Sequence, residues 1–434
     1  MQQNQRKTTP HLSRRTLIKA GIGAYAALSF GRPARAQSPT RLNFAFWGQQ
    51  PEQEGFNRLI EKYQAKNPNV AIKAEIVPPG PQYYQLLDTR LAGGQGPDLF
   101  RVQYQRIGKY AQNRAAVDLS RYLDKDFGAG FGSTFWAAAS FEGKVFALPH
   151  HTDTFGLYYN IDHFEKAGLE APKSLDKSWS WDEFIKAARR LKEKQTAPYP
   201  FAMHWVLSNA YRWLPFLYQH GGAMLDADFK SPMINSKTGI ETIAWTQSWF
   251  KEGLVPANTS IKGTEATQNL FANGTISMLL NGNWQIPFLN EQMTRFRWGV
   301  TYMPRDVAMA SDLGGNCVAV SKDSKNPEVA ADFLKFIASE ENMREFIIAG
   351  QFLPVRKSLM QETIAFKVRP ELMPVFVQQA TTIPEHMART EVLPKWSEIN
   401  VKLNDELDLA FTSGQSPEAT AKNLETAVKQ ILAA

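Results

Sequence analysis

An alternation of strand-like and helix-like segments begins near residue 41 and limits the possible folds more than any other feature of this chain. Strands are expected at residues 41–47, 70–77 and 97–102, and helices at residues 51–67, 82–92 and 107–113. In the first of these helices, Phe56, Leu59 and Ile60 have the spacing of one buried helical face. The alternation predicts an α/β fold in which helices cover both faces of a parallel sheet. Ligands of such sheets bind beyond the carboxyl ends of the strands.

The first 36 residues predict a secretory signal peptide that is not part of the fold. Residues 17–30 are mostly apolar but too short to span a bilayer, and Ala34-Arg35-Ala36 offers the small residues that a signal peptidase needs. The string SRRTLIK at residues 13–19 resembles the twin-arginine export consensus. A general secretion signal with a chance pair of arginines is the alternative. We expect the mature protein to be soluble in a bacterial periplasm.

Charge, cysteine content and size narrow the classes of protein further. The formal net charge is +7, but the predicted signal holds seven basic residues and no acidic one, so the mature chain is close to neutral. The charge therefore gives no reason to expect nucleic acid or a membrane surface as a partner. Cys317 is the single cysteine, which excludes an intramolecular disulfide. A chain of 434 residues exceeds what one hydrophobic core usually holds, so we expect two domains.

Residues 150–160, HHTDTFGLYYN, place a polar cluster directly before an apolar strand. His151 and Asp153 belong to the cluster, and residues 155–159 form the apolar run. Removing polar groups from water is unfavourable unless they find partners. We therefore interpret this segment as a crossing between two lobes, with its polar groups facing a cleft. Capping of a loop is the alternative role for Asp153.

Several motifs in a fixed order resemble the extracellular solute-binding proteins of ABC importers, in the large carbohydrate-binding family that includes maltose-binding protein. The motifs are GPDLF at residues 96–100, LP at 148–149, LYYN at 157–160, WDE at 181–183, the segment 271–284, GG at 314–315, NPEVAADFL at 326–334 and LPVR at 353–356. The resemblance covers nearly the whole chain after the signal. It implies a two-lobed periplasmic-binding-protein fold, type II-like, with two interleaved α/β domains and an inter-lobe cleft. Lobe 1 would comprise residues 37–149 and 314–349, and lobe 2 residues 150–313 and 350–434.

The resemblance also implies which side chains face a ligand. The residues that the resemblance implies are Gln49, Gln50, Gln105, Arg106, Asp153, Trp205, Trp284, Gly315, Asn316 and Arg356. Trp47, at the end of the first strand, and His151, in the polar cluster, are further candidate ligand-binding residues. Aromatic rings suit the apolar face of a pyranose, and carboxylates, amides and arginines suit its hydroxyl groups. A position in the core is the alternative for Trp47, Trp205 and Trp284. Ion pairing between the lobes is the alternative for Arg106 and Arg356.

These features predict a non-enzymatic periplasmic binding protein without cofactor or metal. It would act as a monomer that captures a sugar, an oligosaccharide or a polyol in a hinged cleft and presents it to the permease subunits of an ABC transporter. The runner-up ligand is a phosphorylated polyol such as glycerol 3-phosphate, for which Arg106, Arg356 and His151 would carry more weight. A periplasmic carbohydrate-active hydrolase is a further alternative, because paired carboxylates can come from distant positions. The scattered histidines form no metal-binding pattern.

Overall fold

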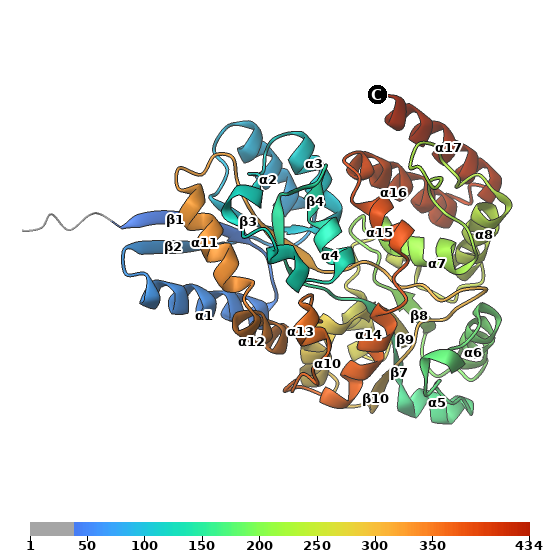
Figure 1. The fold of residues 1–434 in the computed structure, drawn as a ribbon. Helices are drawn as coiled ribbons and strands as arrows, with labels where there is room; N and C mark the ends of the chain where they lie inside the picture. The colour runs from blue at the N-terminus through green and yellow to red at the C-terminus, as the bar shows by residue number, and fades with distance from the viewer. Residues whose placement is uncertain (1–38) are drawn as a thin grey trace, which may run out of the picture. The chain divides into compact units, whose positions relative to one another are not determined.

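Two β-sheets organise residues 39–434, which are the residues that the computed structural model describes (Figure 1). The predicted signal peptide lies outside this range, so the structure says nothing about it. The first sheet has the strand order β2-β1-β3-β11-β6 and the second the order β10-β7-β9-β8. The α/β fold class is confirmed, although both sheets are mixed rather than parallel.

The first sheet begins with the alternation that the sequence predicts. Its strands are β1 (Thr40–Phe46), β2 (Val70–Ile76), β3 (Leu99–Gln103), β6 (Ala147–His151) and β11 (Asn316–Val320). Strand β1 pairs in parallel with β2 and β3, whereas β11 runs antiparallel to both β3 and β6. The predicted parallel arrangement is confirmed for β1, β2 and β3, and it does not extend to β11, which lies between β3 and β6. Parallel neighbours need a long crossover connection, and β11 instead arrives from the second sheet through a loop.

The second sheet is buried on both faces. Its strands are β7 (Phe155–Asn160), β8 (Tyr199–Met203), β9 (Ile276–Gly282) and β10 (Trp298–Thr301). Leu157 pairs with Leu280, and both enter one core; Tyr158 pairs with Leu279, and both enter the core on the opposite face. This alternation follows from the two-residue period of a strand. Residues 140–145 add a small two-stranded sheet, β4 (Ser140–Phe141) and β5 (Lys144–Val145).

Helices cover each sheet. Those within the first part of the chain, or next to β11, are α1 (Gln50–Lys66), α2 (Pro81–Ala92), α3 (Ile107–Gln112), α4 (Ser133–Ala138), α11 (Pro327–Ile337) and α12 (Glu340–Gly350). Those between β7 and β10 are α5 (Ile161–Ala167), α6 (Trp181–Glu193), α7 (Leu214–Gln219), α8 (Lys237–Lys251), α9 (Thr267–Ala272) and α10 (Ile286–Gln292). Helix α6 begins with a capping box: the Glu183 amide donates to the Ser180 hydroxyl, and the Ser180 amide donates to the Glu183 carboxylate.

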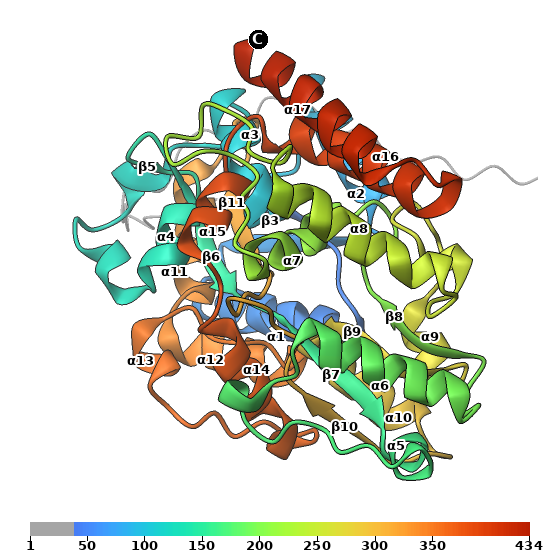
Figure 2. The same cartoon turned by 90° about the vertical axis from the view of Figure 1, so that its right-hand side faces the viewer.

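The C-terminal region is helical. Its helices are α13 (Lys357–Met360), α14 (Met373–Ala380), α15 (Glu385–Glu391), α16 (Trp396–Ser413) and α17 (Pro417–Ala433). Helices α16 and α17 pack on each other and on α8 (Figure 2). Helix α15 contributes to both large cores, because Met387 enters the core of the second sheet and Ala388 that of the first. None of the helices in residues 39–434 combines the length and apolar character needed to cross a membrane.

Candidate ligand-binding site

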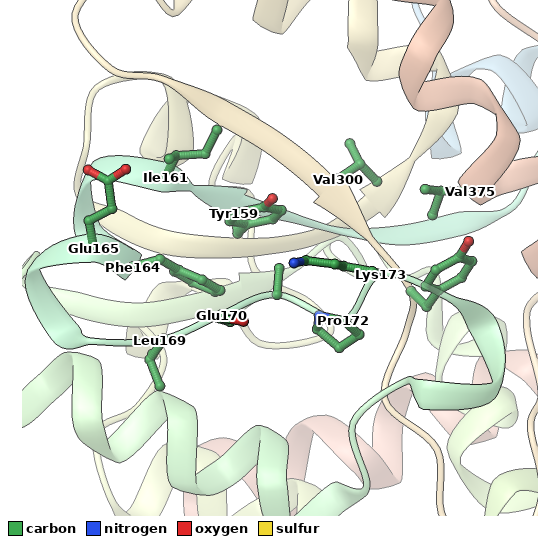
Figure 3. A pocket seen from close by; sticks show the side chains of 12 residues that line it. Tyr159, Ile161, Phe164, Glu165, Leu169, Glu170, Pro172, Lys173, Val300 and Val375 are labelled. Atoms are coloured by element: carbon green, nitrogen blue, oxygen red, sulfur yellow. The ribbon is translucent and has the colours of Figure 1, made fainter.

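One surface pocket lies away from every predicted site residue. It measures about 390 Å³ and is formed by α5, β10 and the loop after α5, with Tyr159, Phe164, Lys173 and Tyr302 in its lining (Figure 3). The Tyr302 hydroxyl already donates to Gln378 at 2.8 Å. The predicted site residue Asp153 lies elsewhere, where the chain passes between the two sheets.

Three segments meet at this passage and hydrogen-bond to one another. The Thr152 and Leu353 backbones exchange two hydrogen bonds, at 3.0 Å and 2.9 Å. The Thr152 hydroxyl donates to the Gly314 carbonyl at 3.1 Å, and the Gly314 N–H donates to the Asp153 carbonyl at 3.2 Å. All five residues from His150 to Thr154 are buried, so the polar segment lies inside the protein and not on its surface.

Glycines at positions 314 and 315 allow the segments to approach this closely. A Cβ atom on Gly314 would lie 1.9 Å from Oδ1 of Asp153, which is far inside contact distance. Gly315 has φ +95°, and a Cβ there would lie 2.4 Å from the carbonyl oxygen of His151. Only glycine adopts such a φ without strain. The pair is therefore required by the packing of the passage around Asp153.

The Asp153 side chain is 6% exposed, and its Oδ1 atom has no hydrogen-bond partner within residues 39–434. Burial raises the pKa of this carboxyl to about 7; Arg212 opposes the increase and Asp312 adds to it. Leaving a buried acceptor without a partner is unfavourable. Asp153 thus keeps an unused hydrogen-bond acceptor inside the protein.

Arg212 approaches Asp153 from the second sheet's side. It belongs to a short 3₁₀ turn, η5 (Ala210–Trp213), and forms a buried ion pair with Asp312 at 3.3 Å. Asp312 also accepts the Phe155 N–H at 3.0 Å, which holds the carboxylate at the start of β7. The Arg212 guanidinium lies 4.5 Å from the Phe155 ring centroid and 4.9 Å from that of Trp284. Stacking on these two rings fixes the plane of the guanidinium.

Trp284 lies in the turn η7 (Asn283–Gln285) directly after β9. Its ring rests on Gly282, where an added Cβ would be 1.7 Å from the indole. A narrow gap separates it from the start of α1, and this gap is lined by Gln49, Pro51, Glu52, Trp284, Pro287 and Gly350. The partly exposed indole thus borders elements of both sheets.

On the first sheet's side, Arg101 in β3 is buried and neutralised. Its guanidinium lies 2.7 Å from the Glu52 carboxylate and 2.8 Å from Nε2 of His151, with the Trp47 ring centroid at 4.8 Å. Asn316 Nδ2 lies 3.2 Å from the same His151 nitrogen. Burial, reinforced by Arg101, holds the pKa of His151 well below its usual value. Since both neighbours of Nε2 are N–H donors, the neutral ring carries its proton on Nδ1, which lies 4.0 Å from Asp153.

Glu391 completes the arrangement from the end of α15. It is fully buried, and one carboxylate oxygen accepts the Gln105 amide at 2.7 Å, while the same amide donates to the Leu313 carbonyl at 2.6 Å. The other oxygen, Oε1, has no partner in the described chain. Burial raises the pKa of Glu391 well above its usual value. We name Glu52, Arg101, Asp153, Arg212, Asp312 and Glu391 the central cluster.

Comparison with known proteins now identifies the family. Residues 47–344 match the family described as bacterial extracellular solute-binding protein. The chain belongs to this family. A binding protein of Brucella abortus (strain 2308) is 24% identical over 381 residues, covering 87% of this chain and 89% of its own length. The galactooligosaccharide-binding protein of Bacillus subtilis (strain 168) is 23% identical over 401 residues, with 89% of each chain covered.

The fold of the family member agrees with solved structures. An ABC transporter solute-binding protein of Thermotoga lettingae, crystallised with α-D-tagatose, superimposes with a TM-score of 0.78 at 21% identity. The match covers 91% of this chain and all of the other chain. The predictions of a periplasmic-binding-protein fold and of a solute-binding protein rather than an enzyme are confirmed.

The structure brings most of the predicted site residues of this solute-binding protein to the central cluster. The residues at or directly beside it are Trp47, Gln49, Gln105, His151, Asp153, Trp284, Gly315 and Asn316. Gln49 lies at the N-terminus of α1, where its N–H donates to Glu52 at 2.7 Å. Gln105 uses its amide nitrogen within the protein, and this suggests a role in holding Glu391 rather than in contacting a ligand.

Four predicted residues have other surroundings. Trp205 is 1% exposed, donates to the Thr259 carbonyl and stacks on Trp249 and Phe411, so its core alternative holds. Gln50 is exposed and donates to Glu54 on its own helix. Arg106 lies 3.6 Å from the centroid of the Tyr84 ring. Arg356 donates to the Ala338 carbonyl and lies over the Phe131 ring, and neither contact involves a residue of the central cluster.

Sequence reasoning missed Glu52, Arg101, Arg212, Asp312 and Glu391. A signal existed for Arg101, which is a charged residue inside the otherwise apolar strand LFRVQ, and for Arg212, which stands among aromatic residues. Charged side chains are seldom fully buried without a partner. Glu391 gave no local signal, because its helix reaches the cluster only through tertiary packing. Within residues 39–434, no three His, Cys, Asp or Glu side chains are placed to hold a metal ion.

Proposed function

We propose that this protein is the substrate-binding component of an ABC importer for a sugar or oligosaccharide, which it binds at the central cluster. The observation that carries the proposal is a set of buried polar atoms, in and next to the central cluster, that have no partner within residues 39–434, together with the partly exposed Trp284 over the Arg212 guanidinium. They include Oδ1 of Asp153, Oε1 of Glu391, Nε of Arg212 and Oδ1 of Asn316. Buried polar groups are normally hydrogen-bonded, and a saccharide supplies both donors and acceptors.

The chemistry of the cluster suits a saccharide in two ways. An aromatic ring such as Trp284 covers the C–H face of a pyranose, and carboxylates and guanidinium groups bind its hydroxyls. The curated relatives support this reading, because their names include a multiple sugar-binding protein of Streptococcus mutans and a maltodextrin-binding protein of Bacillus subtilis. A polyol offers the same hydroxyl groups and remains within the proposed class.

The two sheets would belong to two lobes that close around the ligand. We assign residues 37–149 and 314–349 to lobe 1, and residues 150–313 and 350–434 to lobe 2. Core packing favours moving the second boundary, because Phe352, Val355 and Leu359 are buried with the first sheet. Since Asp153 and the glycine pair lie where the segments cross, a ligand there would contact both lobes and favour the closed state through its additional contacts.

We also propose how the protein is exported and where it delivers its ligand. The chain would be exported through the predicted signal, by the twin-arginine pathway, act as a monomer in the periplasm, and deliver its ligand to the permease subunits of the transporter. Transport energy would come from a partner ATPase.

A thermal-shift panel tests this function. Sugars, oligosaccharides, polyols, uronates and sugar phosphates are each added to the mature protein, and their amounts are measured before and after incubation. We expect at least one saccharide or polyol to raise the melting temperature and to be recovered unchanged; a ligand at one hundred times its Kd stabilises by about 2.7 kcal/mol. Consumption of a saccharide would replace the proposal with the hydrolase alternative, and a panel without any shift would contradict it.

A further inference from the structure

Both cations of the central cluster are already paired, so neither leaves an uncompensated positive charge for a ligand. Both of its cations have a carboxylate partner: Arg101 lies 2.7 Å from Glu52, and Arg212 lies 3.3 Å from Asp312. All four of these side chains are at least nine-tenths buried. Each guanidinium is therefore neutralised within the protein before any ligand arrives.

Two further carboxyl groups have no such partner. Asp153 is 6% exposed and Glu391 is fully buried, and within residues 39–434 neither forms an ion pair with a lysine or arginine. Among the described residues, Oδ1 of Asp153 and Oε1 of Glu391 have no hydrogen-bond partner. Their remaining neighbours are the neutral His151, 4.0 Å from Asp153, and the Gln105 amide on Glu391. The groups left for a ligand are thus carboxyl groups and not unpaired cations.

The residues that favoured an anionic ligand in the sequence do not supply a free cation here. The Arg106 guanidinium is stacked on Tyr84, and that of Arg356 donates to the Ala338 carbonyl. His151 is buried, and its Nε2 faces two N–H donors. The phosphorylated polyol that these residues suggested would therefore meet unpaired carboxyl groups without a compensating positive charge. Bringing a charge into a buried site without a counter-charge disfavours binding strongly.

We propose that this site binds uncharged or amine-bearing saccharides and discriminates against sugar acids and sugar phosphates. The inference rests on the proposed function and defines its ligand class. Asp153 and Glu391 accept hydrogen bonds from hydroxyl or ammonium groups, and the Nε atom of Arg212 donates to a hydroxyl oxygen. A carboxylate or phosphate on the ligand would have to displace Glu52 or Asp312 from its arginine to find a cation.

Matched ligand sets test the discrimination. Calorimetry at constant ionic strength and pH 8 measures the binding of each ligand. The ligands are glucose, glucosamine, glucuronate and glucose 6-phosphate, then galactose with its three corresponding derivatives, and neutral maltotriose. We expect neutral or amino members to bind, and the acid and phosphate forms of the same sugar to bind at least tenfold more weakly. Equal or tighter binding of an acid or phosphate overturns the inference but leaves the proposed function standing. If no member binds in this set or in the thermal-shift panel, the proposed function fails and the inference with it.

A charge-removing variant assigns the discrimination to Asp153. Asp153→Asn keeps the shape of the side chain and removes the negative charge that a carboxyl group with a pKa of about 7 carries at pH 8. We expect this variant to reduce the ratio of neutral to acidic affinity at least threefold. The matched control Asp228→Asn removes a charge from an exposed loop and leaves the ratio unchanged. Circular dichroism verifies that each variant is folded, and an unchanged ratio in Asp153→Asn would refute the assignment.

Discussion

Asp153→Asn is expected to change how the stability of this protein depends on pH. The carboxyl group has a folded-state pKa of about 7 against an ordinary value of 3.8. The groups facing it are Arg212 and Asp312 from the second sheet's side, Arg101 and Glu52 from the first, and His151. Because the folded pKa is raised, the folded protein holds a proton that the unfolded chain releases. This contribution to stability is complete below pH 3.8 and is lost as the pH rises through 7.

The magnitude follows from the size of the shift. Each pKa unit corresponds to about 1.4 kcal/mol, so ionisation of Asp153 costs the folded protein about 4 kcal/mol in total at alkaline pH. Between pH 5 and pH 8 the cost increases by about 2–3 kcal/mol. An asparagine cannot ionise and escapes this loss. The variant should therefore gain about 2–3 kcal/mol relative to the native protein between these two pH values.

Urea unfolding of both proteins at pH 5 and pH 8 measures this double difference in the free energy of unfolding. The contributions of most other titrating groups are the same in both proteins and cancel in this double difference. The exposed Asp228→Asn variant should therefore show a double difference close to zero. A relative gain below about 0.5 kcal/mol, or one of opposite sign, would mean that Asp153 is ionised in the folded protein at pH 5. The raised pKa of Asp153, and with it the unfavourable burial of its charge, would then be refuted.

Three substitutions test other parts of the site. Arg101→Met leaves a buried carboxylate without its cation and should cost about 3–5 kcal/mol in urea unfolding; a cost below about 1 kcal/mol would contradict a buried ion pair. Gly314→Ala forces a Cβ into the neighbouring carboxylate and should cost at least about 1–3 kcal/mol, whereas Gly93→Ala, with its nearest atom at 3.5 Å, should be tolerated. Trp284→Ala should weaken saccharide binding about tenfold or more, which is about 1.4 kcal/mol by calorimetry; unchanged affinity would assign the indole to the core.

The sequence predicted the early part of the fold well because its patterns are local. The strand and helix alternation over residues 41–113 reappears as β1 to α3, with bounds that differ by a few residues. The antiparallel entry of β11 could not be read in the same way. Residues 314–321 form an apolar strand pattern, but the pairing partner of a strand is decided by the path of the chain over more than a hundred residues, which no local period records.

The candidate site was predicted in part for the same reason. Asp153 and Trp284 stand out locally, as a polar residue before a buried strand and an indole after a glycine turn. Trp205 carries a similar local signal and yet packs in the core, because its exposure depends on Trp249 and Phe411 from distant helices. Arg212 and Glu391 become site residues only through tertiary packing, so their importance follows from burial and missing partners and not from spacing.

A crystal structure of the protein with the tightest-binding neutral saccharide of the panel tests the central claim most directly. The account predicts a saccharide in contact with the Trp284 ring and within hydrogen-bond distance of Asp153 or Glu391, with groups from both sheets around it. A saccharide bound elsewhere, such as the surface pocket beside Tyr159 and Tyr302, with the central cluster unchanged, would contradict it.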